Sequence, residues 1–330
     1  MVAMRVLIRF MFTAAVLLVG VAGTTPARAA SGSCSFSISN LVFGNVSTIS
    51  PNPVDVTATL TANCSGFSTS AVQICAASIG FPHSDGTRQM SNGRDALAYQ
   101  LYSDAGRQNV WGTANSGIAP APGYSMSLSN GSGTATFPVY GRLFGGQFSA
   151  GAGAYVDTYS GSNAELLYFG GDAGGQPCAV GSVATYEVAF NVVATVIPDC
   201  DMTVQRNLVF PATGLIRSPL SVSFQLGATC TNRSSYSISL DDGASSGGPS
   251  RVDQRYLNLA SGGTAYLVAY NLYLDSAATQ VWGDGTRGTA VLQGTGIGQK
   301  QAYVGYGRVP PQALPAPGTY TGRVTATITY

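Results

Sequence analysis

Charged residues and catalytic side chains are scarce in this chain of 330 residues. Only 9% of the residues are charged, against about 25% in an average soluble domain, and the chain has a single His. It has no block of Lys and Arg, whereas nucleic-acid binders need clustered cations to neutralise phosphates. With one His and no Cys pair at C-x-x-C spacing, most metal sites lack ligands. The composition therefore disfavours nucleic-acid binding and predicts a protein that is not an enzyme and holds no metal or cofactor.

Residues 1–29 have the pattern of a secretory signal peptide. Arg5 and Arg9 precede an apolar run over residues 10–21, and Ala27-Arg28-Ala29 forms an A-x-A cleavage site. The apolar run is short for a bilayer span, so a membrane anchor is the weaker alternative. We expect export of a mature chain that begins at residue 30.

All six cysteines follow the signal peptide, and disulfides are the usual state of cysteines in exported proteins. Two pairs of cysteines share a spacing of 30 residues, and one pair remains. The predicted disulfides are Cys34–Cys64, Cys200–Cys230 and Cys75–Cys178. Free thiols or metal sites are the alternatives, but they need a reducing compartment or His partners.

The second half of the sequence repeats motifs of the first half in the same order. The matched segments are Asn40–Phe43 with Asn207–Phe210, Val110-Trp111-Gly112 with Val281-Trp282-Gly283, Tyr140-Gly141-Arg142 with Tyr306-Gly307-Arg308, and Gly153-Ala154-Tyr155 with Gly318-Thr319-Tyr320. The repeats separate near residues 196–199. This predicts an N-terminal domain over residues 30–196 and a C-terminal domain over residues 197–330.

Both copies have the sequence pattern of β-strands. Residues 54–60 and 220–226 alternate apolar and polar side chains, and residues 188–196 are rich in β-branched side chains. Asn-Gly and Asp-Gly pairs mark turns between such segments, and no helical period occurs after residue 30. The expected fold is all-β, with two tandem Ig-like antiparallel β-sandwich domains.

The last strand of the sequence indicates that the second copy is incomplete. Its alternation places Val324, Ala326, Ile328 and Tyr330 on one face. In the first copy a further strand over residues 186–196 follows the corresponding segment, and the second copy has no counterpart. We expect the second domain to lack its last strand, with these four residues lining a groove that a donor strand completes. The alternative is that six paired strands suffice and Tyr330 lies at a protected edge.

The cysteine spacing, the two Tyr-Gly-Arg strands, the Pro-rich stretch before Gly318 and the alternating last strand resemble the spore coat U domain family. This family includes subunits of archaic (Csu-type) chaperone–usher pili. The resemblance implies incomplete Ig-like subunits that receive a strand from a periplasmic chaperone. At an outer-membrane usher, the N-terminal extension of the next pilus subunit then replaces that strand.

The N-terminus suggests a position for this subunit in the fibre. Cleavage after Ala29 leaves only residues 30–33 before Cys34, and four small residues span about 13 Å at most. Such a segment is too short to serve as a donor strand and has no large side chain to fill a groove. We therefore expect the subunit to stand at the pilus tip. Its route would lead through the periplasm to the cell surface. A complete domain followed by an incomplete one is also the layout of two-domain tip adhesins.

An adhesive surface is expected on loops of the first domain that lie away from the second, over residues 65–75, 112–130 and 160–179. Apolar side chains there are interpreted as an exposed hydrophobic patch, and such patches usually mark interaction sites. The candidate adhesion residues are Leu166, Leu167, Tyr168, Phe169, Ile118 and Tyr124. They would attach the cell to hydrophobic abiotic or host surfaces and so promote biofilm formation. The alternative is that they pack onto the sandwich.

Two other functions compete with this hypothesis. One is a glycan-binding tip lectin, since Trp111 and exposed Tyr side chains stack well on sugars. Trp111 and Trp282 occupy equivalent positions in the two copies, however, which favours a core role for both. The other is a structural cap protein like those of spore coats.

Overall fold

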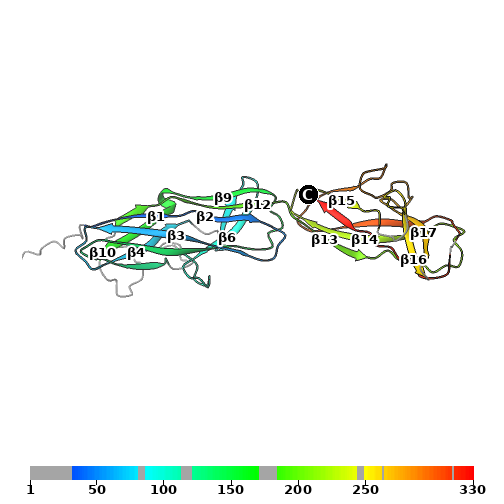
Figure 1. The fold of residues 1–330 in the computed structure, drawn as a ribbon. Coiled ribbons are helices and arrows are strands. Elements are labelled where there is room, and N and C mark those ends of the chain that lie inside the picture. Colours follow the sequence, from blue (N-terminus) through cyan, green and yellow to red (C-terminus); the bar gives the residue numbers. More distant parts are fainter. Residues whose placement is uncertain are drawn as a thin grey trace, which may run out of the picture.

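The structure is a computed structural model that describes residues 32–80, 86–112, 121–170, 184–243, 249–261, 264–313 and 316–330. The predicted signal peptide, residues 1–29, lies outside the described residues. The strands form two groups that follow each other along an elongated molecule (Figure 1). We term residues 32–196 the N-terminal half and residues 197–330 the C-terminal half.

The N-terminal half is a sandwich of two sheets. Its strands are β1 (Ser33–Ile38), β2 (Leu41–Val46), β3 (Val54–Ser65), β4 (Ala71–Ile79), β5 (Arg88–Ser91), β6 (Ala96–Tyr102), β7 (Gly123–Ser127), β8 (Gly133–Leu143), β9 (Gly153–Tyr159), β10 (Ala164–Gly170), β11 (Ala184–Glu187) and β12 (Phe190–Val196), with a short 3₁₀ turn, η1 (Gly161–Asn163), before β10. One sheet has the order β1-β3-β8-β6-β5-β9-β12-β2 and the other β11-β10-β4-β7. Its strand pairs are antiparallel except for β2 with β12, which run parallel.

The C-terminal half copies most of this topology. Its strands are β13 (Cys200–Arg206), β14 (Leu220–Cys230), β15 (Ser235–Leu240), β16 (Arg255–Ser261), β17 (Thr264–Tyr273), β18 (Leu292–Thr295), β19 (Lys300–Val309) and β20 (Ala326–Thr329). The order β13-β14-β19-β17-β16 matches β1-β3-β8-β6-β5, and β20 pairs with β15 as β10 pairs with β4. The structure therefore confirms the predicted all-β class and the internal repeat.

Local sequence explains the strands and their turns. The alternating segment 54–60 lies in β3, where polar side chains face outwards and Ala58 and Leu60 are buried. Between β7 and β8, Asn130 and Gly131 have φ angles of 48° and 73°, a conformation that Asn and Gly adopt most readily in tight hairpins. The predicted strands over residues 220–226 and 188–196 correspond to β14 and β12.

Each half has its own apolar core, and in each core a tryptophan is fully buried. Trp111 and Trp282 are both 0% exposed, which confirms that their repetition reflects packing. Disulfides join β1 to β3 through Cys34 and Cys64, and β13 to β14 through Cys200 and Cys230. These are the two pairings that the repeated spacing predicts.

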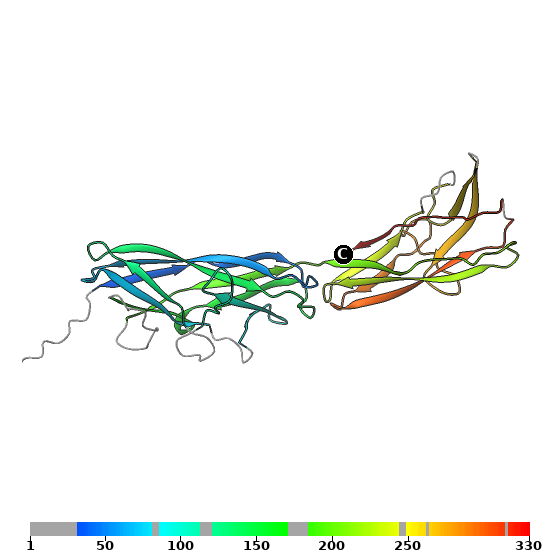
Figure 2. The ribbon, with the colours of Figure 1, turned by 90° about the horizontal axis from the view of Figure 1, so that it is seen from below.

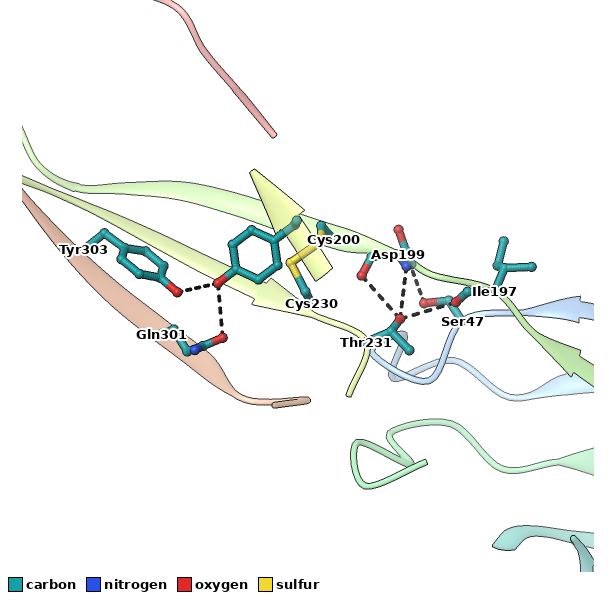
Figure 3. Close-up of a disulfide and its surroundings, with 9 residues drawn as sticks. Ser47, Ile197, Asp199, Cys200, Cys230, Thr231, Gln301 and Tyr303 are labelled. Carbon is teal, nitrogen blue, oxygen red and sulfur yellow. Dashed lines mark hydrogen bonds between the residues drawn. A yellow bond between two sulfur atoms is a disulfide. The ribbon is translucent and has the colours of Figure 1, made fainter. Parts of the chain in front are cut away.

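A short segment joins the halves, and polar contacts fix it on both sides (Figure 3). The Ser47 hydroxyl donates to the Asp199 carboxylate, and the backbone N–H of Asp199 donates to the Thr231 hydroxyl at 3.0 Å. Arg233 forms an ion pair with Asp95 across the junction. Burial opposes ionisation of Asp95, but the Gly151 amide and Arg233 prevail and lower the pKa of its carboxyl. The two halves are therefore linked by side chains as well as by the chain itself.

Candidate functional site

Strand β12 completes the sandwich of the N-terminal half. It lies between β9 and β2, with seven residue pairs to the first and four to the second. Its alternate side chains are buried in the core: Phe190, Val192, Ala194 and Val196. Phe190 stacks on the ring of Tyr159, with 4.5 Å between the ring centroids. The last strand of this half therefore supplies a continuous row of core side chains.

In the described part of the C-terminal half, no strand takes the place of β12. The counterpart of β9 is present, because Thr321 pairs with Asn258 of β16 as Val156 of β9 pairs with Ser91 of β5. The counterpart of β2 is the segment 207–210. Its Leu208 and Phe210 pack near Gly307, as Leu41 and Phe43 pack near Gly141. Both walls of the missing strand's site are therefore in position.

A groove of about 730 Å³ opens between these walls. Apolar side chains form most of its floor and sides, namely Met202, Val204, Leu208, Val209, Phe210, Phe224, Leu226, Leu240, Leu257, Tyr270, Leu272, Tyr320, Val324 and Ala326. Leu41 and Phe43 lie on β2 beside β12 and are 1% and 5% exposed, whereas their counterparts Leu208 and Phe210 are only half-buried. The open groove accounts for this difference in burial.

The groove also has a polar side. Arg206 and Arg323 belong to its lining, and the described lining residues include no Asp or Glu. The Tyr270 hydroxyl lies within it, close to Gly322. Burial raises the pKa of Tyr270, so this phenol is neutral at physiological pH. The site can accept an extended, mainly apolar segment that offers hydrogen-bond acceptors.

The four residues predicted to line the groove differ in their positions. Val324 and Ala326 line it, and Ile328 is half-buried against the core of the C-terminal half. Tyr330 is 54% exposed, and β20 ends one residue before it. On one side β20 pairs with β15, and it forms an edge of its sheet. The sequence pattern predicts a groove along residues 324–330, whereas the groove in the structure is lined by residues 319–326.

The prediction that residues 166–169 form an exposed loop is wrong. They belong to β10, which pairs with both β4 and β11, and Leu166, Leu167 and Tyr168 are 0%, 6% and 7% exposed. Leu166 and Tyr168 enter the main core, while Leu167 packs on the opposite side against Cys75 and Phe169. Four consecutive apolar residues fit a strand here because both of its faces are covered.

The other adhesion candidates lie in different surroundings. Tyr124 is on strand β7, half-buried, and packs against Phe137 with 4.7 Å between the ring centroids. Ile118 lies outside the described residues. Cys75 is disulfide-bonded, and its predicted partner Cys178 also lies outside the described residues. The structure thus brings none of the described candidates together into an exposed apolar patch.

A buried arginine in each half is a feature that the sequence analysis missed. Arg255 is 0% exposed and donates hydrogen bonds to the carbonyl oxygens of Asp241, Leu240 and Trp282 and to the Asn271 amide oxygen. Arg88 is 1% exposed and makes the equivalent contacts with Ile79, Trp111 and Gln100. The sequence did contain a signal for these arginines: an amide side chain, Gln100 or Asn271, recurs between Tyr and Leu in both copies and accepts a hydrogen bond from the buried arginine.

Other kinds of site receive no support from the described ranges. Within them, no group of three or more His, Cys, Asp or Glu side chains is placed to hold a metal ion. The same residues contain no helix that is long and apolar enough to cross a membrane. The groove is therefore the feature of the described structure on which a functional hypothesis rests.

Comparison with known proteins gives a family and a fold. The chain resembles one chain in the crystal structure of the CsuC–CsuE chaperone–tip adhesion subunit pre-assembly complex from archaic chaperone-usher Csu pili of Acinetobacter baumannii, with 17% identity and a TM-score of 0.54 over 90% of this chain and 100% of that chain. The CupB6 tip adhesin from Pseudomonas aeruginosa matches with 15% identity and a TM-score of 0.39 over 90% of this chain and 94% of that chain. No curated protein matches the chain significantly.

At 17% identity, the likeness to the Acinetobacter structure shows a shared fold. The family is shown by the sequence itself, because the model of the Spore Coat Protein U domain matches residues 22–161 and again residues 186–327. The two matches correspond to the two copies of the repeat. The chain belongs to the Spore Coat Protein U domain family.

Proposed function

We propose that this protein is the tip subunit of an archaic chaperone–usher pilus. The C-terminal domain, residues 197–330, accepts a donor strand from another polypeptide, and the N-terminal domain, residues 30–196, makes the adhesive contact. The observation that carries the proposal is the groove at the position that β12 fills in the other half. A groove of this kind is suited to β-augmentation, in which an extended segment adds to an exposed sheet edge.

The energy of filling the groove supports the proposal. In the N-terminal half, β12 buries Phe190, Val192 and Val196 together with one alanine. At about 1.5–3 kcal/mol for each large side chain, three such residues contribute about 5–9 kcal/mol. This is comparable with the whole stability of a small domain. The C-terminal domain is therefore expected to depend on a strand supplied from outside.

The proposed partners follow from the family and the structural neighbour. A periplasmic chaperone occupies the groove first; the Acinetobacter neighbour is itself named as a pre-assembly complex of a chaperone with a tip adhesion subunit. At an outer-membrane usher, the N-terminal strand of the next pilus subunit then takes its place. The protein thus passes through the periplasm and ends at the cell surface, with the N-terminal domain foremost.

Adhesion is assigned to the end of the N-terminal domain that lies away from the junction. Strands β1, β3 and β8 run to this end, where Cys64 is in register with both Cys34 and Gly133. A single tip need bind only weakly, because many fibres on a cell bind together through multivalency, which promotes biofilm formation on abiotic or host surfaces. Replacement of Ile118 by Ser is expected to lower attachment to plastic without lowering the number of fibres. Unchanged attachment would remove Ile118 from the adhesive surface.

The direct test of the proposal uses a donor strand fused to the chain. The mature chain is extended after Tyr330 by a flexible Gly/Ser linker and a copy of residues 184–196, the segment that completes the N-terminal half. We expect the extended chain to be monomeric and more stable than the chain made alone, which should aggregate unless its chaperone is present. The matched control carries Ser at the four inward positions of the copy.

The measurements are gel filtration and denaturant unfolding. If the unextended chain is monomeric and as stable as the extended chain, the C-terminal domain needs no donor strand and the proposed function fails. If the Ser-containing extension stabilises equally well, the groove does not recognise apolar side chains, and the assignment of the groove fails.

A further inference from the structure

The groove of the C-terminal half and the filled site of the N-terminal half share the same aromatic wall. Phe43 meets Tyr99 edge to face with 6.3 Å between ring centroids, and Phe210 meets Tyr270 in the same way at 6.2 Å. Both tyrosines are buried, at 0% and 2% exposure. The two sites are therefore comparable residue by residue.

The two tyrosine hydroxyls differ in their partners. The Tyr99 hydroxyl donates to Asp157 Oδ2 at 2.6 Å and also contacts the Tyr159 hydroxyl. In the C-terminal half, the repeat places Gly322 where Asp157 stands and Val324 where Tyr159 stands. Among the described residues no group forms a hydrogen bond with the Tyr270 hydroxyl. The hydroxyl that has an acceptor in the N-terminal half therefore has none among the described residues of the C-terminal half.

The space beside this hydroxyl belongs to the groove. A Cβ atom built on Gly322 would lie 3.5 Å from the Tyr270 hydroxyl and 3.1 Å from Leu257 Cδ2, so Gly322 faces inwards at this point. Both Gly322 and Tyr270 line the groove. Water can reach the hydroxyl while the groove is open, but an occupying strand displaces that water. A wholly apolar occupant would then leave the hydroxyl buried and unsatisfied, which is costly.

The pairing of β12 shows which residue of an occupant meets this hydroxyl. Val192 of β12 stands directly opposite Asp157 of β9 and is also paired with Leu41 of β2. The corresponding position in the C-terminal half lies opposite Gly322 and beside Leu208. Directly opposite residues on antiparallel strands have Cβ atoms about 5 Å apart and share a face of the sheet. A short side chain at this position therefore reaches the space that the Asp157 carboxylate fills in the N-terminal half.

The charges of the groove indicate the chemistry of this side chain. Its lining contains Arg206 and Arg323, and the described lining residues provide no acidic partner for them. A tyrosine hydroxyl that donates its proton needs an acceptor, and Asp157 is the acceptor in the equivalent position. An aspartate or asparagine matches the hydroxyl, the available space and the positive lining.

We propose that the strand accepted by the C-terminal half carries a short hydrogen-bond acceptor, Asp or Asn, at the position opposite Gly322, and that Tyr270 reads this residue. The inference rests on the proposed function, because it presumes that a strand of another polypeptide fills the groove. It makes Tyr270 a specificity-determining residue that distinguishes the correct strand from other apolar segments. The remaining inward positions of the strand supply apolar contact.

The test uses the full chain extended after Tyr330 by the linker and the copy of residues 184–196. At the copied Val192 position the extension carries Val, Asn or Asp, and each version is made with Tyr270 and with Tyr270→Phe. The equilibrium constant for unfolding of the C-terminal half is measured by denaturant titration. For each version of Tyr270, the equilibrium constant for unfolding with Val in the extension is divided by that with Asn or Asp. We expect this preference for Asn or Asp to fall about tenfold when the Tyr270 hydroxyl is removed.

A second variant supplies the acceptor from within the chain. In Gly322→Asp the side chain takes the place of Asp157, so the preference for Asn or Asp in the extension should again fall about tenfold. The matched control is Tyr99→Phe, which should leave the preference unchanged because its hydroxyl is satisfied inside the N-terminal half. If the preference is the same with Tyr270, Tyr270→Phe and Gly322→Asp, the inference is overturned. If no extension stabilises the chain at all, the proposed function has failed instead.

Discussion

Replacement of Arg255 by Met tests whether the buried arginine holds the C-terminal sandwich together. The guanidinium donates to the carbonyl oxygens of Leu240 and Asp241 at the C-terminal end of β15, to that of Trp282, and to the side-chain amide oxygen of Asn271 on β17. Loss of a hydrogen bond to a buried acceptor costs about 1 kcal/mol, which gives about 4 kcal/mol for the four acceptors. Desolvation of the charge, which lowers the pKa of Arg255, is relieved by the substitution and offsets part of this cost. We expect a net loss of about 2–3 kcal/mol.

The assay is denaturant unfolding of the chain carrying the donor extension. In a Trp111→Phe background, the fluorescence of Trp282 reports on the C-terminal half alone, and a shift in midpoint at constant slope gives the change in the free energy of unfolding. Arg88→Met in a Trp282→Phe background is the matched variant, since Arg88 has the same kind of partners. A loss below about 1 kcal/mol in both halves would show that the carbonyls find other partners, and would refute the role of the arginines.

Three further variants have defined outcomes. Replacement of Cys200 and Cys230 by Ser opens a loop of 30 residues and should lower the unfolding free energy by about 3–4 kcal/mol, measured by denaturant titration. Leu167→Ser should lower the melting temperature of the N-terminal half, because the side chain is 6% exposed; an unchanged value would contradict its burial. Asp95→Asn removes the ion pair with Arg233, and small-angle scattering should then show a more flexible junction. Because folding lowers the pKa of the Asp95 carboxyl, the ion pair should hold the wild-type junction fully above the ordinary carboxyl pKa and lose this effect as the pH falls through the lowered pKa.

The sequence predicted the parts of the fold that depend on one-sided burial. The segment 54–60 alternates because one face meets the core and the other meets water, so its pattern alone identifies a strand. Repeated motifs identified two copies, and the equal cysteine spacing gave the pairs Cys34–Cys64 and Cys200–Cys230. These features are local or repeated, and both kinds can be recognised in the sequence without knowledge of tertiary contacts.

Features that depend on tertiary contacts were predicted poorly. Residues 166–169 do not alternate, since Leu166 enters the main core while Leu167 packs against Cys75 on the other face. A run that is apolar on both faces has no period, so its sequence does not distinguish a strand covered on both sides from an apolar loop. The groove was expected along Val324 to Tyr330, but the crossing of the chain from Thr321 beside β16 to β20 beside β15 moves it towards residue 320. Only the partner strands fix that crossing point.

The position of β12 has a mechanical consequence. This strand is held between β9 and β2, and the chain continues from its end directly into the C-terminal half (Figure 2). Tension between the two halves therefore pulls β12 along its own axis, so that its residue pairs on both sides are loaded together in shear rather than peeled apart one at a time. A load between the halves therefore enters the N-terminal sandwich through a strand that is paired on both of its edges.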